Sequence, residues 1–282
     1  MEMIRQLDLS DYIRRALAED VGQGDLTTAA TVSPGQLGRA IIKVKEPRMI
    51  VAGAFLIEQV FAMTGAEPNM LTLTDEGCEL KAGDVLADVE GRLAGLLVGE
   101  RTALNFVQLL SGIATATRVY VEAIAGTRAK IIDTRKTHPG LRVLEKYAVR
   151  AGGGHNHRLG LDSGVLIKEN HVAAAGGITP AIKRARQLAP HTIRIECECE
   201  TLAQVDEAVR AGADAILLDN MTLAQVREAR AKVGEKIILE VSGGITRDTV
   251  RALAETGVDL ISVGALTHSV KAVDISMRID QT

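Results

Sequence analysis

Aromatic residues are scarce in this chain: they make up 2% of its 282 residues, and tryptophan is absent. Proteins that bind single-stranded nucleic acid stack bases on aromatic side chains and hold phosphates on a basic surface. With few aromatic groups, a formal net charge of −3 and a pI near 6.1, the chain has neither feature. The composition therefore argues against a nucleic-acid-binding protein.

Cysteine is also rare, and two of the three cysteines, Cys197 and Cys199, lie two positions apart. An odd number with this spacing provides neither a disulfide framework nor a set of metal-binding cysteines. No apolar run approaches the roughly 20 residues that a membrane helix needs, and the charged start of the chain differs from a secretory signal. We therefore expect a cytoplasmic protein without a membrane span, with one large or two ordinary domains.

The first third of the chain alternates strands with turns more than with helices. Residues 1–19 have the pattern of an amphipathic helix, and residues 21–28 that of a turn-rich loop. Apolar segments predict a helix at 53–63 and strands at 39–45, 48–52, 70–75, 84–90 and 93–98. This pattern favours an α+β layer with an antiparallel-leaning sheet, followed by a long helix at 100–125 in which Gly112 marks a possible break between domains.

After residue 112, the pattern of predicted elements changes to strands that alternate with helices. Apolar strands are expected to begin near residues 130, 165, 193, 215, 237 and 260, and helices are expected at 178–188, 201–211, 222–232 and 246–256. The later intervals are about 22 residues long, the size of one βα unit, so the strands should form a parallel sheet. Residues 113–268 are too few for eight such units, which predicts an incomplete α/β barrel of six or seven strands.

Polar residues follow the predicted strands at the points where they end. In α/β barrels the carboxyl ends of the strands form the active face, so these residues should converge on one cavity. They are Asp133, Thr134, Arg135 and Lys136; Lys168; Glu196 and Glu198; Asp219 and Asn220; Ser242, Gly243 and Gly244; and Gly264.

The segment 133–171 is a basic island, with seven Lys or Arg and four acids, in a chain that is otherwise acidic. For a lone Lys or Arg, a solvated surface position is the ordinary interpretation. Cations gathered at two strand ends instead favour an anion-binding site, because Arg forks suit carboxylate or phosphate and Lys acts as a point charge. These cations are Arg135, Lys136, Arg158 and Lys168.

Acidic residues end two further strands. Alternation along residues 192–200 places Cys197 on one face and Glu196 and Glu198 on the other, and Asp219 ends its strand in the same manner. A solvated strand edge is the alternative, but carboxylates that face a barrel mouth are a natural site for Mg²⁺ or for ribose hydroxyls. His157 is more plausible as a substrate contact or proton donor than as a metal ligand.

Several motifs, taken together and in order, resemble the quinolinate phosphoribosyltransferase family. They are GDLTT at 24–28, ERTALNFVQLLSGIAT at 100–115, DTRKT at 133–137, GGGHNHR at 152–158, LIKENH at 166–171, ECE at 196–198, LLDN at 217–220, VSGGI at 241–245 and ISVGALTHS at 261–269. The resemblance spans nearly the whole chain. One departure is His138, where the family pattern leads us to expect Thr or an aliphatic residue, and which could alter the pocket wall.

The resemblance implies an N-terminal α/β sandwich (1–112), an incomplete α/β barrel that carries catalysis (113–268) and a C-terminal segment that returns to the first domain (269–282). It implies a Mg²⁺-dependent transfer of phosphoribosyl from phosphoribosyl pyrophosphate to quinolinate with decarboxylation, for NAD biosynthesis, in a homodimer. Arg101, from the partner, with Arg135, His157, Arg158 and Lys168 would bind quinolinate. The residues that would bind phosphoribosyl pyrophosphate and its Mg²⁺ are Lys136, Glu198, Asp219, Ser242, Gly243, Gly244 and Gly264. Thr134 would be a further substrate contact. Lys136, Glu198 and Asp219 are the catalytic candidates.

Other classes of function stay open at this point. Lys168 at a strand end could form a Schiff base, as in barrel aldolases. The chain could also bind phosphoribosyl pyrophosphate without turnover, as a regulatory protein would. A related transferase that acts on another aromatic acid is the nearest alternative, because acid specificity depends on arginine geometry.

Overall fold

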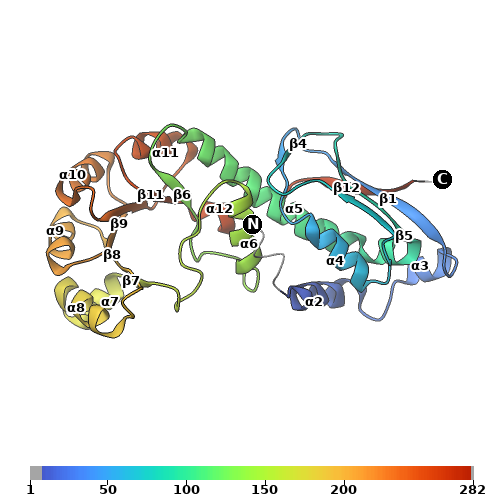
Figure 1. The fold of residues 1–282 in the computed structure, drawn as a ribbon, viewed down its shortest axis with the longest axis horizontal. Coiled ribbons are helices and arrows are strands. Elements are labelled where there is room, and N and C mark those ends of the chain that lie inside the picture. Colours follow the sequence, from blue (N-terminus) through green and yellow to red (C-terminus); the bar gives the residue numbers. More distant parts are fainter. Residues whose placement is uncertain (1–7, 281–282) are drawn as a thin grey trace. The chain divides into compact units, whose positions relative to one another are not determined.

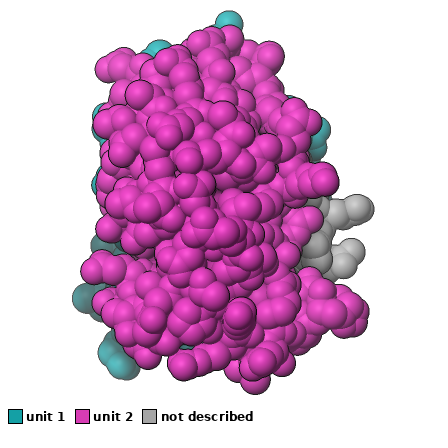
Figure 2. Space-filling view, turned by 90° about the vertical axis from the view of Figure 1, so that its left-hand side faces the viewer, with its two compact units in different colours: residues 1–118, 138–153, 269–282 teal, residues 119–137, 154–268 magenta. Residues whose placement is uncertain are grey.

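The computed structural model describes residues 8–280, which form two compact units. Of the described residues, unit 1 holds 8–118, 138–153 and 269–280, and unit 2 holds 119–137 and 154–268. Figure 2 colours unit 1 teal and unit 2 magenta. Within residues 8–280, no helix is both long and apolar enough to cross a membrane.

Unit 1 contains a four-stranded antiparallel sheet (Figure 1). Its order is β12 (Ile275–Asp280), β1 (Leu37–Val44), β5 (Val85–Arg92) and β3 (Met70–Leu73). The last strand of the chain, β12, pairs with β1, so that Met277 lies opposite Ile42. A smaller pair joins β2 (Met49–Ile50) to β4 (Glu79–Leu80). The observed sheet confirms the antiparallel arrangement expected for the first third.

The helices of unit 1 correct two predictions. They are α2 (Ser10–Val21), α3 (Leu26–Thr31), α4 (Phe55–Met63), α5 (Leu93–Ala123) and α6 (Arg142–Ala151). The strand predicted at 93–98 is wrong, because these residues open α5, which continues through Gly112 without a break. Residues 26–28 are helical rather than a loop because Asp25 caps α3, accepting the Thr28 N–H at 3.0 Å. The start of the predicted first helix, at residues 1–7, lies outside the described residues.

Unit 2 is built on six parallel strands in one sheet. Their order is β6 (Lys130–Ile132), β11 (Leu260–Ser262), β10 (Ile238–Ser242), β9 (Ala215–Asp219), β8 (Ile195–Cys199) and β7 (Val165–Ile167). The strands β6 and β7 are the two edges, so the sheet does not close, and His155 makes a single parallel bridge to Ile132 beside β6. The predicted incomplete barrel is thus confirmed with six strands.

Helices cover the outside of this sheet. They are α7 (Glu169–Ala175), α8 (Ile178–Leu188), α9 (Leu202–Ala211), α10 (Leu223–Val233) and α11 (Arg247–Ala254). A short helix, α12 (Ala265–His268), follows β11 at the carboxyl ends of the strands. In Figure 1, α8 to α11 follow the arc of the strands: α8 packs on β7 and β8, α9 on β8, α10 on β10 and α11 on β11. Their apolar residues, such as Val205 and Val226, are fully buried. The polar ends of the strands are therefore left to face the interior of the barrel mouth.

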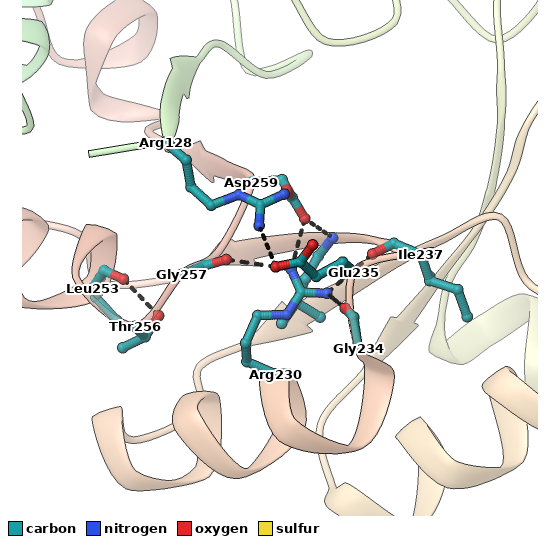
Figure 3. Close-up of polar contacts among 10 residues, drawn as sticks. Arg128, Arg230, Gly234, Glu235, Ile237, Leu253, Thr256, Gly257 and Asp259 are labelled. Carbon is teal, nitrogen blue, oxygen red and sulfur yellow. Dashed lines mark hydrogen bonds and ion pairs between the residues drawn. The ribbon is translucent and has the colours of Figure 1, made fainter. Parts of the chain in front are cut away.

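The amino ends of β10 and β11 are held by Asp259, which Figure 3 shows between two arginines. Arg128 and Arg230 donate to its two carboxylate oxygens at 2.6 and 2.8 Å. The backbone N–H of Leu239 donates to the same carboxylate at 2.9 Å, and Arg230 also donates to the Ile237 carbonyl at 3.1 Å. This cluster fixes the strands at the end opposite to the polar strand ends.

Candidate active site

A cavity of about 480 Å³ lies within unit 2 and is lined by residues from the carboxyl ends of all six strands. A volume of this size suits small-molecule substrates. Every predicted site residue except Arg101 lines it: Thr134, Arg135, Lys136, His157, Arg158, Lys168, Glu198, Asp219, Ser242, Gly243, Gly244 and Gly264. Arg101 is an exposed residue of α5 in unit 1. His138 also belongs to unit 1, and its ring contacts Glu145 at 2.5 Å.

The loop that carries His157 and Arg158 is anchored on Asp133, the buried residue directly after β6. Asp133 accepts the backbone N–H of His157 at 2.9 Å and the side-chain amide of Asn156 at 2.5 Å. Because Asp133 also precedes Arg135, one buried carboxylate organises both cation-bearing segments. Sequence analysis placed Asp133 at a strand end but gave it no role.

Two arginines, Arg135 and Arg158, line the same cavity. Burial, and then the charge of Arg135, lower the pKa of Arg158, while Glu196 acts in the opposite direction. Arg158 donates from Nη1 to the Gly164 carbonyl at 2.8 Å. Its Nε is buried and, among the residues the structure describes, has no hydrogen-bond partner. Buried donors beside a second cation form a site that an anion would complete.

Two acidic strand ends, Glu198 and Asp219, line the same cavity. Glu196, which was also expected there, lines a second pocket nearer the amino ends of the strands. On the other face of β8, Ile195, Cys197 and Cys199 are fully buried, which confirms the predicted alternation. The Lys168 ammonium donates to Glu198. Asp219 accepts the side-chain amide of Asn220 at 2.8 Å. The site therefore holds cations and carboxylates side by side at neighbouring strand ends.

Gly243 after β10 leaves no room for a side chain, and Gly264 after β11 leaves little. Gly243 has φ +91°, and a Cβ there would lie 2.1 Å from Asn220 Oδ1. A Cβ at Gly264 would lie 3.2 Å from the His268 ring and 3.3 Å from the Lys136 stem. These contacts explain why glycine occupies both positions, and they leave the backbone open to the cavity.

Sequence analysis missed a buried cluster within the barrel. Glu240 is 1% exposed and lies between Ser262, which donates to it, and Glu196. Burial and the neighbouring Glu196 raise the pKa of Glu240 well above its ordinary value. The ligand atoms of His157, Glu196 and Glu240 lie within 4.8 Å of one another, so the three could hold a metal ion. Strand alternation signalled that Glu196 points inward, but nothing in the sequence pairs it with Glu240.

Fold and site together define a class: an incomplete α/β barrel with a cavity at the carboxyl ends of its strands, lined by cations, carboxylates and glycines. Comparison with protein families makes this specific. Residues 25–111 match the N-terminal domain of quinolinate phosphoribosyl transferase, and residues 113–278 match the C-terminal domain of the same enzyme. The chain belongs to the quinolinate phosphoribosyltransferase family.

Individual relatives are similar to this chain over nearly the full length of both proteins. The chain is 45% identical to a probable nicotinate-nucleotide pyrophosphorylase (carboxylating) of Bacillus subtilis, over 98% of this chain and 95% of the relative. It is 44% identical to the nicotinate-nucleotide pyrophosphorylase (carboxylating) of Mycobacterium leprae, over 95% of this chain and 96% of the relative. Among solved structures, NadC from Streptococcus pyogenes superposes with a TM-score of 0.92 at 40% identity, covering 96% of this chain and 95% of that chain.

Proposed function

We propose that the cavity of unit 2 binds quinolinate and phosphoribosyl pyrophosphate together and joins them with loss of carbon dioxide. The activity follows from the family: the chain is a decarboxylating quinolinate phosphoribosyltransferase of NAD biosynthesis, a pentosyltransferase. The observation that carries the site assignment is the pair of neighbouring guanidinium groups, Arg135 and Arg158, in a cavity that also holds acids and glycine loops.

Quinolinate is a dicarboxylate, and the basic side of the cavity provides for its two charges. Arg158 offers a buried Nε donor, and Arg135 lies close to it. Lys168 supplies a third cation, and His157 lines the same side. An arginine binds a carboxylate through paired hydrogen bonds, so two arginines orient the ring as well as hold it. The ring nitrogen would then be aimed at the ribose.

The other side of the cavity suits phosphoribosyl pyrophosphate. Lys136 provides charge for a phosphate, and its backbone is held by Thr134 Oγ1, which accepts the Lys136 N–H at 3.0 Å, and by Thr267, which donates to its carbonyl at 2.7 Å. Backbone close to the cavity at Gly243, Gly244 and Gly264 allows N–H groups to approach phosphate oxygens, with the hydroxyl of Ser242 beside them.

Glu198 and Asp219 would hold Mg²⁺ or the ribose hydroxyls. Two carboxylates from adjacent strands fit this ion, which binds few protein oxygens and completes its shell with phosphate and water. When bound, Mg²⁺ neutralises charge on the departing pyrophosphate. Lys136 would stabilise that same departing charge, and Glu198 and Asp219 would offset the positive charge that develops on the ribose.

The reaction proceeds by attack of the pyridine nitrogen on ribose C1 as pyrophosphate leaves. The nitrogen then carries a positive charge, which stabilises the electron pair that remains at C2 when the adjacent carboxylate departs as carbon dioxide. A proton replaces the carboxylate at C2, and the product is nicotinate mononucleotide. The part of the protein is to hold the two substrates in line and to place charges where they develop.

We also propose a homodimer in which Arg101 of one subunit reaches the cavity of the other. Arg101 is exposed on α5, which makes it available to a partner. Mixing Arg101→Ala subunits with Arg158→Ala subunits tests this, because a shared site regains part of the activity only in the mixture. Equal inactivity of the mixture and both parents would contradict the shared site.

We also propose a cytoplasmic location. Cys78, Cys197 and Cys199 are free thiols, as is usual in a reducing compartment. Cell fractionation checks this location.

A product assay tests the site assignment. The purified enzyme, with Mg²⁺ and phosphoribosyl pyrophosphate, should release carbon dioxide and nicotinate mononucleotide from quinolinate and give no product from nicotinate. Arg158→Ala should raise the KM for quinolinate by roughly 100-fold, the loss of a charged hydrogen-bonded contact, and change the KM for phosphoribosyl pyrophosphate far less. Arg210→Ala, at an exposed arginine of α9, is the matched control. Equal effects of Arg158→Ala on both KM values would overturn the assignment.

A further inference from the structure

Asn220 joins the carboxyl ends of two neighbouring strands. It follows β9, and its Nδ2 donates to the Oδ2 of Asp219, the last residue of that strand, at 2.8 Å. Its backbone N–H donates to the carbonyl of Ser242, the last residue of β10, at 3.0 Å. Asp219 and Ser242 are direct partners in the register of the two parallel strands. Asn220 therefore bridges the point where β9 and β10 end together.

The amide of Asn220 also lies against Gly243, the residue after β10. A Cβ at Gly243 would lie 2.1 Å from Asn220 Oδ1 and 2.6 Å from its Cγ, distances at which a methyl group does not fit. The side chain thus packs directly on the backbone of the glycine loop formed by Gly243 and Gly244. Both glycines and Asp219 line the cavity. One side chain therefore contacts two parts of the cavity wall that are assigned to phosphoribosyl pyrophosphate.

The backbone of Asn220 has a left-handed conformation, with φ +53°. Among the non-glycine residues that the structure describes, Glu67 is the one other with a positive φ. Asparagine adopts this conformation more readily than most residues, so the turn alone could account for an asparagine here. The turn does not account for the hydrogen bond to Asp219 or the contact with Gly243, which belong to the side chain. The two roles can therefore be separated by substitution.

Asp219 has one carboxylate oxygen held and one available for a ligand. Within residues 8–280, the Asn220 amide is the one hydrogen-bond donor to this carboxylate. Asn220 is itself exposed and lies outside the lining of the cavity, so it acts on a substrate through its neighbours. Hydrogen bonds that orient a carboxylate ligand typically strengthen metal binding by roughly 10- to 100-fold. The Asn220 amide is placed to give Asp219 such support.

We propose that Asn220 is a positioning residue for phosphoribosyl pyrophosphate. It fixes the Asp219 carboxylate and the backbone at Gly243 relative to each other, so that the ribose or its Mg²⁺ and a phosphate group are held at one spacing. This inference rests on the proposed function, in which Asp219 and the glycine loop bind that substrate. It adds a residue that touches neither substrate and that aligns two of the contacts made by phosphoribosyl pyrophosphate.

Asn220→Gly removes the side chain and keeps the turn, because glycine adopts a positive φ without strain. The KM for phosphoribosyl pyrophosphate should rise about tenfold, whereas the KM for quinolinate should stay within about threefold of the wild type. The dissociation constant for Mn²⁺, measured with phosphoribosyl pyrophosphate and no quinolinate, should also rise about tenfold. Unchanged values for Asn220→Gly, or a parallel rise of both KM values, would overturn the proposal.

Glu67→Gly is the matched control. It makes the same kind of exchange at the other non-glycine residue with a positive φ, at an exposed position in unit 1. Both KM values should stay within about threefold of the wild type, because the substitution changes no residue of unit 2. If Glu67→Gly raised the KM for phosphoribosyl pyrophosphate as much as Asn220→Gly, the effect would not come from the Asn220 contacts, and the proposal would be wrong.

A double substitution tests the contact with Gly243. Gly243→Ala alone should lower kcat/KM for phosphoribosyl pyrophosphate by roughly 100-fold, because its methyl group meets the Asn220 side chain. In Asn220→Gly the nearest remaining atom of residue 220 is the backbone nitrogen at 3.0 Å, so the same substitution should lower kcat/KM by less than about tenfold. Equal losses in the two backgrounds would refute the contact and the proposal with it.

Thermal unfolding of the same variants needs no activity. Gly243→Ala should lower Tm more in the wild-type background than in Asn220→Gly, because only the wild type has the side chain that the methyl group meets. Equal shifts in Tm would refute the contact. A wild type that turned over no quinolinate would refute the proposed function, and the unfolding results would still decide whether Asn220 holds the glycine loop.

Discussion

Lys168 and Glu198 form an ion pair across two neighbouring strand ends, with the ammonium donating to Glu198 Oε2. Lys168 is assigned to a quinolinate carboxylate, and Glu198 to the ribose or to Mg²⁺. Each residue therefore has one partner in the free enzyme and another in the complex. Binding of either substrate has to open the pair, and the second substrate then finds its own residue released.

This relationship predicts that the two substrates bind cooperatively. Benzene-1,2-dicarboxylate has the two carboxylates of quinolinate without the nucleophilic nitrogen, so it reports binding without turnover. Its dissociation constant should fall about fivefold when Mg²⁺ and phosphoribosyl pyrophosphate are present, a coupling of about 1 kcal/mol. Isothermal titration calorimetry measures both values.

Glu198→Gln should remove most of this coupling, because the amide no longer holds Lys168 by charge. The same variant should bind the dicarboxylate more tightly than the wild type when phosphoribosyl pyrophosphate is absent. Glu200→Gln changes an exposed acid just after β8 and is the control. A coupling that persists in Glu198→Gln would show that the ion pair does not carry it.

The glycine loop after β10 gives a second prediction. Gly243→Ala places a methyl group 2.1 Å from Asn220 Oδ1, and Asn220 holds Asp219. We expect kcat/KM for phosphoribosyl pyrophosphate to fall by roughly 100-fold, because both the loop and Asp219 must shift. Steady-state kinetics with each substrate varied in turn measures the effect.

Gly212 provides a matched control for Gly243. Its φ is +85°, so alanine there carries a similar backbone strain, but a Cβ would meet nothing within 4 Å. Gly212→Ala should lower stability by about 1 kcal/mol and leave kcat/KM near the wild-type value. If both variants lost activity equally, strain of the backbone and not the contact with Asn220 would be responsible.

The barrel could be predicted because its signals are local and repeated. The strand that contains Ile216 is short and apolar, and the following helix has Thr222 as its N-cap in a capping box. Since all strands are parallel, their polar ends had to meet. That topological rule brought Arg135, Lys168 and Asp219 to one cavity before any contact was known.

Other features depend on contacts that one sequence does not display. Residues 93–98 are a short apolar run, which suits a strand or a helix equally. In the structure they form a helix in which Gly95 packs so closely on Ala66 that a Cβ would lie 2.3 Å from the Ala66 nitrogen, a contact between segments distant in the sequence. Likewise, in the sequence Glu240 is a single polar residue within an apolar strand, and its contacts are not evident. Its neighbours Ser262 and Glu196 lie on other strands, β11 next to it and β8 two strands away, and no local pattern in the sequence pairs them with it.

Asp259 gives a prediction about stability. It accepts hydrogen bonds from Arg128, Arg230 and the backbone of Leu239, as Figure 3 illustrates for the two arginines. Asp259→Asn should lower the free energy of unfolding by about 2–4 kcal/mol, because the mostly buried Arg230 loses its counter-ion. Urea denaturation measures it. Arg128→Ala removes the more exposed partner and should lower stability by about 1 kcal/mol or less. A reversed order would mean that Arg230 does not need the charge.

The contact between His138 and Glu145 predicts a pH dependence of stability. Glu145 is fully buried, and burial raises its pKa above the ordinary value of 4.5, although hydrogen bonds from His138 act in the opposite direction. A carboxyl whose pKa is higher in the folded state binds its proton more tightly there. Its contribution to stability is therefore complete below about pH 4.5 and is lost as pH rises through the folded-state pKa.

Glu145→Gln has no group that titrates at this position, so it isolates the effect. The free energy of unfolding of the wild type, minus that of Glu145→Gln, should decrease as pH rises from 4.5 towards neutrality. His138→Ala should make the decrease steeper, because it removes the ring contact that favours the ionised carboxylate, while the backbone N–H of residue 138 still donates to Glu145. Urea denaturation at several pH values gives these differences, and charges common to the variants cancel. A difference that stays flat or grows with pH would mean that the contacts of His138 outweigh the burial of Glu145.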